Sequence, residues 1–209
     1  MSYENVSPTR INLIETKKTL NLAESGREVL ERKRDILLRE LRNSIYEAER
    51  TREELLESLG KAYQKLRDAN MAKGSETVSS VALGSSNEAH YVIDYKSIMG
   101  VTVPSVEFQG APDVKPDYGF ANTSVELDKA FKHFQSILTL IADLARAEGA
   151  TFQIANDVRR TQRRVNALNY VLIPRYRKTA KWIELVLEEK DREEFVRTKI
   201  IKRVIKERK

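Results

Sequence analysis

The sequence has 209 residues, of which 41% are apolar and 33% charged, with a formal net charge of +6 and no cysteine. This composition excludes a membrane-embedded protein and a disordered chain, and the lack of cysteine excludes disulfides and thiolate chemistry. No apolar run approaches the ~20 residues that cross a bilayer, and the first residues lack a signal-peptide layout. We therefore expect a cytosolic protein without direct membrane insertion.

The first segment, residues 1–73, is predicted to form one long helix. It contains no proline after Pro8, and its apolar residues recur at steps of three and four. Ser7 is expected to cap the helix with Pro8 in the first turn, and Gly74 to end it. The predicted coiled-coil seam, meaning the stripe that faces a partner helix, comprises Leu38, Leu41, Ile45, Ala48, Arg52, Leu55, Leu59, Ala62, Leu66 and Ala69.

The second segment, residues 74–123, is predicted to be an insertion, because it holds most of the glycine, proline and serine. Its first part is GSETVSSVALGSSNEA, for which we expect a flexible loop. Its last part, APDVKPDYGF, is expected to be an irregular return to the next helix.

Between these parts the sequence predicts a short β-hairpin. The stretches HYVIDYKSI and GVTVPSVEF alternate apolar and polar residues, with Met99 and Gly100 at the turn. Pro104 restricts its strand to an edge or a bulge. Since two isolated strands are marginally stable, the hairpin is expected to pack against the helices or a partner.

The third segment, residues 124–209, is predicted to form a second long helix to about Ile205. Residues 123–126 have the form of a capping box. The predicted seam comprises Leu127, Phe131, Phe134, Leu138, Ile141 and Ala145. Because neither helix is stable alone with such a stripe exposed, we expect a fold dominated by α-structure. It would be one elongated domain, a long antiparallel two-helix coiled coil with a short β-hairpin and loop insertion.

The sequence shows no pattern typical of an enzyme. It lacks a phosphate-binding glycine-rich motif, and its two histidines, His90 and His133, are far apart without partners at metal-ligand spacing. Acidic pairs such as Glu53 and Glu54 fit a solvated helix face better than an acid/base pair. We therefore expect no catalytic, cofactor-binding or metal-binding residues.

Two basic clusters are candidates for partner binding, one within the second helix and one in its last turns. They comprise Arg159, Arg160, Arg163, Arg164, Lys199, Lys202, Arg203, Lys206 and Arg208. The alternatives are a solvated helix face, with pairing to Asp157, or phosphate contacts with nucleic acid.

The second helix also carries three residues that are unfavourable in a helix. An asparagine in the seam, Asn166 or Asn169, would weaken packing but fix the register. Pro174 removes a backbone hydrogen bond and clashes with the preceding turn, so we expect a bend or local loosening near Tyr170.

Several stretches resemble the D subunits of the V-type and archaeal A-type ATPases. Near the amino end these are PTRINL, with Lys17, Lys18, Leu20, Ala23, Gly26, Leu30 and the Lys33-Arg34-Asp35 run at the family spacing. Near the carboxy end they are RRTQRRVNALNYVLIPRYRKTAKWI and REEFVRTKIIK. The resemblance covers both predicted helices.

The resemblance implies a non-catalytic central-stalk rotor that couples ATP hydrolysis or synthesis to a membrane ring moving protons or sodium ions. The implied partners are a catalytic ring of A and B subunits, a small F subunit and a funnel-shaped C/d-type subunit. Both chain termini would enter the A/B ring and the loop end would point toward the funnel. The implied location is the cytoplasmic side of the membrane, in a peripheral sector.

Two other functions fit a helical hairpin. A basic coiled-coil nucleic-acid-binding protein is disfavoured because acids interrupt the basic runs and no aromatic platform is present. A prefoldin-like chaperone would expose apolar coil tips, whereas this tip is strongly basic.

Overall fold

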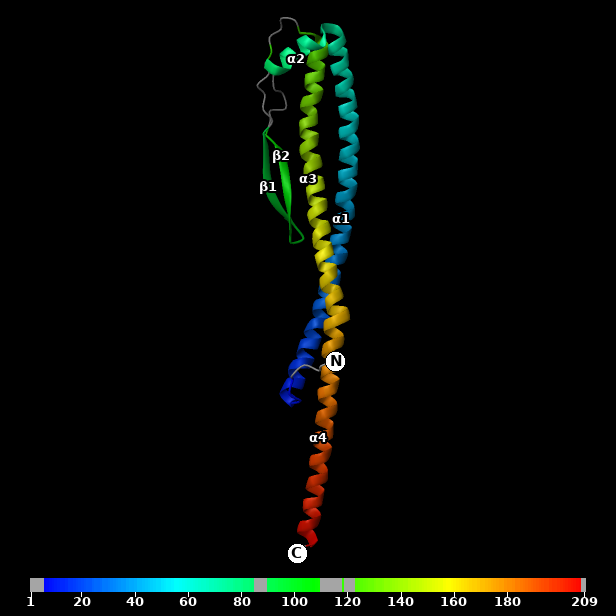
Figure 1. The fold of residues 1–209 in the computed structure, drawn as a ribbon, viewed down its shortest axis with the longest axis vertical. Coiled ribbons are helices and arrows are strands. Elements are labelled where there is room, and N and C mark those ends of the chain that lie inside the picture. The colour runs from blue at the N-terminus through cyan, green and yellow to red at the C-terminus, as the bar shows by residue number, and fades with distance from the viewer. Residues whose placement is uncertain (1–5, 85–89, 110–117, 119–122, 208–209) are drawn as a thin grey trace. The chain divides into compact units, whose positions relative to one another are not determined.

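The computed structural model describes residues 6–84, 90–109, 118 and 123–207. The elements in chain order are α1 (Arg10–Lys73), α2 (Ser75–Gly84), β1 (Tyr91–Ile98), β2 (Val101–Phe108), α3 (Val125–Ala167), a π-helix (Leu168–Leu172) and α4 (Ile173–Glu207) (Figure 1). The predicted fold class is confirmed, because two long helices pack together and a β-hairpin is inserted between them. The chain forms two compact units, one of residues 1–35 with 159–209 and the other of residues 36–158.

The first helix begins two residues later than predicted. Thr9 is the capping residue, because its hydroxyl accepts a hydrogen bond of 3.2 Å from the Asn12 amide. The prediction that Ser7 caps the helix is wrong, since the Ser7 carbonyl instead accepts from the Asn12 side chain at 2.7 Å, and Pro8 precedes the first turn. The predicted end is confirmed, because Gly74 has φ of 81°, which a glycine adopts without strain.

In the second unit, the seam of α1 agrees with the prediction only toward the loop end. The predicted positions Leu55, Ala62 and Ala69 are buried. Ile45, however, is 40% exposed, and Ser44 is buried in its place at 7% exposure. Ser44 lies one heptad after the fully buried Leu37. The buried stripe of α1 therefore runs through Ser44, one residue before the more apolar Ile45 of the predicted seam.

The seam of α3 departs from the prediction in the same way. After Phe134 the buried stripe takes a step of three to Ile137, where a step of four to Leu138 was expected. Ile141 and Ala145 are consequently exposed. The buried residues of this helix up to position 154 are Ala130, Ile137, Ala142, Ala147 and Ile154. The helix begins one residue later than the predicted capping box of residues 123–126 requires, because Ser124 is the residue whose hydroxyl accepts the Leu127 amide at 3.3 Å.

The β-hairpin is confirmed with its turn. Met99 and Gly100 have φ of 52° and 78°, which is typical of a two-residue hairpin turn that follows the twist of the strands. Pro104 lies in β2, whose only strand neighbour among the described residues is β1, so it sits in an edge strand as predicted.

The hairpin packs against the helices of the second unit through β2, which runs beside α3 in Figure 1. The valines Val101 and Val103 form one buried cluster with Leu37 of α1 and Ile154 of α3. The Tyr91 hydroxyl also donates a hydrogen bond of 3.4 Å to the Leu138 carbonyl. These contacts bear out the expectation that two isolated strands need support.

The predicted flexible loop after Gly74 is partly wrong, because residues 75–84 form the helix α2. Val78 is buried, and Val81 and Ala82 line an apolar pocket with residues of α1 and α3. These three positions have the i, i+3, i+4 spacing of one helix face, so apolar burial outweighs the serine-rich composition. The rest of the predicted loop, and the predicted irregular return apart from Tyr118, lie outside the described residues.

Candidate functional site

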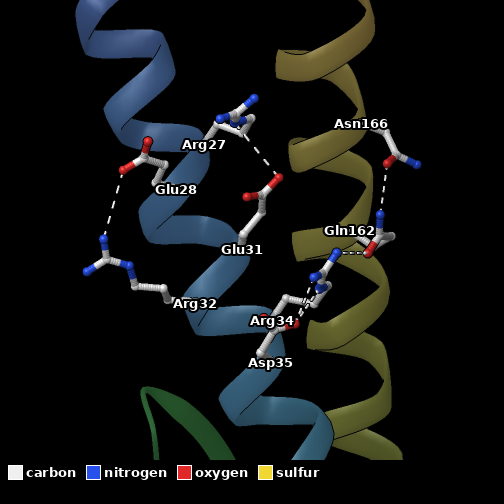
Figure 2. A network of polar contacts seen from close by, with 8 residues as sticks. All are labelled: Arg27, Glu28, Glu31, Arg32, Arg34, Asp35, Gln162 and Asn166. Carbon is white, nitrogen blue, oxygen red and sulfur yellow. Dashed lines mark hydrogen bonds and ion pairs between the residues drawn. The ribbon is translucent and has the colours of Figure 1, made fainter.

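A polar network joins α1 to α3 in the first unit (Figure 2). The Arg34 guanidinium donates to the Asp35 carboxylate at 2.7 Å and to the Gln162 side-chain carbonyl at 3.1 Å. Gln162 in turn donates from its amide nitrogen to the Asn166 side-chain oxygen at 2.8 Å. Because Arg34 satisfies groups on both helices, the network holds the two at one relative position.

Two further ion pairs lie one turn away on α1, between Arg27 and Glu31 at 3.8 Å and between Arg32 and Glu28 at 3.9 Å (Figure 2). Each links residues four apart on one helix, so each stabilises α1 by a few tenths of a kcal/mol at most. These pairs neutralise part of the basic charge on this stretch of α1.

The two asparagines singled out in the sequence occupy different places. Asn166 is exposed and acts through Gln162, whereas Asn169 is half-buried within the π-helix. Gln162 could not be identified from the sequence, because a polar residue between arginines gives no signal until its partner on α1 is known.

The four arginines of the first candidate cluster are all exposed. Arg159, Arg160, Arg163 and Arg164 flank the buried Thr161, and Val165 continues the buried side of the helix. Their exposed guanidinium groups can therefore contact ion partners outside the helix pair.

The helical run from α3 to α4 departs from regular α-helix geometry just before Pro174, where the sequence predicts it. Residues 168–172 form a π-helix, in which the Ile173 amide donates to the Leu168 carbonyl five residues back. Pro174 has no amide hydrogen for the Tyr170 carbonyl, and its ring would clash with that carbonyl in a regular helix. The wider turn removes the conflict, so the predicted local loosening near Tyr170 is confirmed.

The second basic cluster lies on a stretch of α4 that has no packing partner among the described residues. Every residue from 188 to 207 is exposed, including the apolar residues Val196, Ile200 and Val204. Arg203 pairs with Glu207 at 3.1 Å, while Lys199, Lys202 and Lys206 are exposed on the same helix. Arg208 lies outside the described residues.

The described residues contain no group of three or more acidic or histidine side chains that could hold a metal ion. Among them, no helix is apolar over a length sufficient to cross a bilayer. Two of the groups with a shifted pKa are Tyr118 and Glu126 of the second unit. Burial and a hydrogen bond of 2.7 Å to Asp128 raise the pKa of the Tyr118 phenol, and a hydrogen bond from Lys129 lowers the pKa of Glu126. These shifts follow from structural contacts and supply no acid/base pair.

Comparison with known proteins covers nearly the whole chain. Residues 12–203 match the family model described as the ATP synthase D subunit. The chain is 39% identical over 198 residues to the V-type ATP synthase D subunit of Thermotoga neapolitana, which covers 95% of this chain and 97% of that protein. It is 36% identical over 207 residues to the A-type ATP synthase D subunit of Methanopyrus kandleri, covering 99% and 89%. The A-type D subunit of Pyrococcus furiosus is also 36% identical, over 208 residues that cover 97% and 96%.

Proposed function

Because the chain belongs to the family of ATP synthase D subunits, the central-stalk rotor subunits of V/A-type ATP synthases, we propose that it works there as a non-catalytic shaft. It is a subunit of an ATP synthase complex, so other subunits of that complex are its partners. The proposed ones are the catalytic A/B ring, a small F subunit and a funnel-shaped C/d-type subunit. The complex would place the chain in a peripheral sector on the cytoplasmic side of the membrane.

The observation that carries the proposal is the exposed end of α4. The first residue of α1, Arg10, pairs with Asp191, so the residues that follow Asp191 extend beyond the start of α1 (Figure 1). A helix that is amphipathic, basic and uncovered over this length requires a partner to bury its apolar residues. In the proposed complex that partner is the inner surface of the A/B ring.

The basic side chains of this end suit a bearing. Ion pairs between exposed charges are each worth about 1 kcal/mol or less and tolerate a range of geometries. A basic end turning inside a ring would exchange acidic partners without settling at one angle. We therefore propose Lys199, Lys202, Arg203 and Lys206 as the contacts, with Arg208 in the same series.

The exposed arginines 159, 160, 163 and 164 are proposed to bind the ring or the F subunit. The network through Arg34, Gln162 and Asn166 is proposed to hold the helix register beneath them, because a shift of α3 along α1 would separate Arg34 from Gln162. Asn169, within the π-helix, is proposed to contribute to the same register. In this proposal the four arginines contact partner subunits, and the network residues together with Asn169 align the two helices.

The π-helix suggests how rotation could be sensed. We propose that the altered turn before Pro174 makes the shaft eccentric, so that surrounding subunits meet a different face at each angle. Pro174→Ala restores the missing amide and favours a regular α-helix. We expect the variant complex to hydrolyse ATP with less ion pumping per ATP. Full coupling in that variant would contradict the eccentricity.

The proposed function is tested by recovering the tagged chain from native membranes, identifying the bound proteins by mass and assaying ATP hydrolysis in the eluate. We expect an ATPase ring together with a small F-like subunit. Recovery of nucleic acid without ATPase would contradict the rotor function and support a nucleic-acid-binding protein. Recovery of a mixed set of unfolded proteins without ATPase would support a prefoldin-like chaperone.

A further inference from the structure

Three ion pairs cross from α1 to α4 in the first unit at regular intervals, and we call them the ion-pair ladder. The ladder consists of Arg10 with Asp191 at 3.1 Å, Lys17 with Glu184 at 2.9 Å, and Glu24 with Arg177 at 2.6 Å. Moving seven residues forward along α1 moves the partner seven residues back along α4. The three rungs therefore lie along one edge of an antiparallel helix pair, two helical turns apart.

The order of charges along the ladder is not symmetric. The α1 side is positive, positive, negative, and the α4 side is the complement. If α4 slid by one heptad in one direction, Lys17 would face Arg177. A slide in the opposite direction would place Glu24 against Glu184. Each shifted register thus brings like charges together, whereas the observed register has attraction at every rung.

The apolar seam at this end discriminates poorly between the same registers. On α1 it consists of half-buried residues in the order Leu13, Thr16, Leu20 and Ala23. A shift of seven residues exchanges leucine for leucine and threonine for alanine, which are similar in size. The packing loss on shifting is therefore small over these two turns.

We propose that the charge order of the ladder specifies the register between the amino-terminal end of α1 and α4. Exposed ion pairs add little stability individually, but pairs that become repulsive in every wrong alignment provide specificity. The π-helix lies between the Arg34–Gln162 contact and the ladder, and its wider turn changes which face α4 presents to α1, so the alignment at the ladder needs contacts of its own.

The test uses spin-label distances in the isolated full-length chain, so its outcome does not depend on the proposed partner subunits. The chain has no cysteine, so Lys18→Cys and Lys181→Cys place two labels at exposed positions outside the ladder. A slide of one heptad changes their axial offset by about 10.5 Å.

The test variant exchanges the charges of the third rung, with Glu24→Arg and Arg177→Glu. It keeps all three attractive pairs in the observed register but makes the α1 side uniformly positive. Both shifted registers then have two attractive rungs and no repulsive one. We expect a second, longer label distance to appear at low salt.

The matched control exchanges the first rung, with Arg10→Glu and Asp191→Arg. It also keeps every pair, but the alternating order places like charges together at two rungs in each shifted register, so we expect the single distance of the unchanged chain. A variant with the first and second rungs exchanged together is again uniform in charge. It should behave like the test variant, and serves if that variant does not fold. One and the same distance in all variants would overturn the proposal, as would a second distance in the control.

Discussion

Replacing Gly149 with alanine tests how the β-hairpin packs against α3. Gly149 lies within α3, where alanine normally stabilises a helix by about 1 kcal/mol relative to glycine. A Cβ at this position, however, would lie 2.8 Å from Cγ and 3.7 Å from Cδ of Pro104 in β2. The proline ring is fixed to the strand backbone, so the contact is relieved only if the strand moves.

The expected magnitude follows from these two opposing effects. Overpacking of this kind costs about 1–3 kcal/mol, which offsets the gain in helix propensity and leaves a net loss of up to about 2 kcal/mol. Gly60, also within a helix of the second unit, has open space around its Cβ position and is the matched control. We expect Gly60→Ala to raise the free energy of unfolding by about 1 kcal/mol.

The assay is urea unfolding followed by far-ultraviolet circular dichroism. The two alanine variants should differ by about 1–3 kcal/mol, with Gly149→Ala the less stable. In a Pro104→Ala background the ring is absent, and Gly149→Ala should become as favourable as Gly60→Ala. Equal stabilisation by the two substitutions in the unchanged background would refute the close contact between Gly149 and Pro104.

Three further predictions concern single elements. Leu37→Ala should lower the free energy of unfolding by about 2–5 kcal/mol in urea, because Leu37 is fully buried beneath the hairpin. Tyr118→Phe should cost about 1 kcal/mol by removing the bond to Asp128. The pKa of the Tyr118 phenol is raised above its ordinary 10.0, so the stability that the phenol contributes is present below pH 10.0 and is lost as the pH rises above that value. In an ultraviolet titration, the Tyr118→Phe variant should lack the tyrosine that ionises last. Deleting residues 192–209 should change the unfolding free energy of the isolated chain by less than about 0.5 kcal/mol, yet reduce its recovery with the ATPase ring.

Features with a local cause could be predicted from the sequence. The turn at Met99 and Gly100 depends on two adjacent residues, the end of α1 on the backbone freedom of Gly74, and the loosening before Pro174 on one missing amide. The pairing of the two long helices also follows from their apolar periodicity. These signals do not require knowledge of the partner.

Features that depend on pairing could not be predicted in detail. The apolar pattern favours Ile45 as a seam residue, but packing buries Ser44 and leaves Ile45 exposed. The ion-pair ladder gives no signal in the sequence for the same reason, since charges seven residues apart can be recognised as partners only once the opposite helix is aligned. The serine content of residues 75–84 favours a loop, and the helix α2 becomes evident only when the shared burial of Val78, Val81 and Ala82 is known.

The most direct test of the rotor account is to observe rotation of this chain within its complex. Met71, which is exposed near the loop end of α1, is replaced with cysteine and labelled before assembly, because the chain has no other cysteine. A bead on that label is then watched over a surface-held A/B ring. The account predicts unidirectional rotation that starts with ATP and stops when ATP is withdrawn. ATP hydrolysis at the normal rate with a stationary label would contradict it.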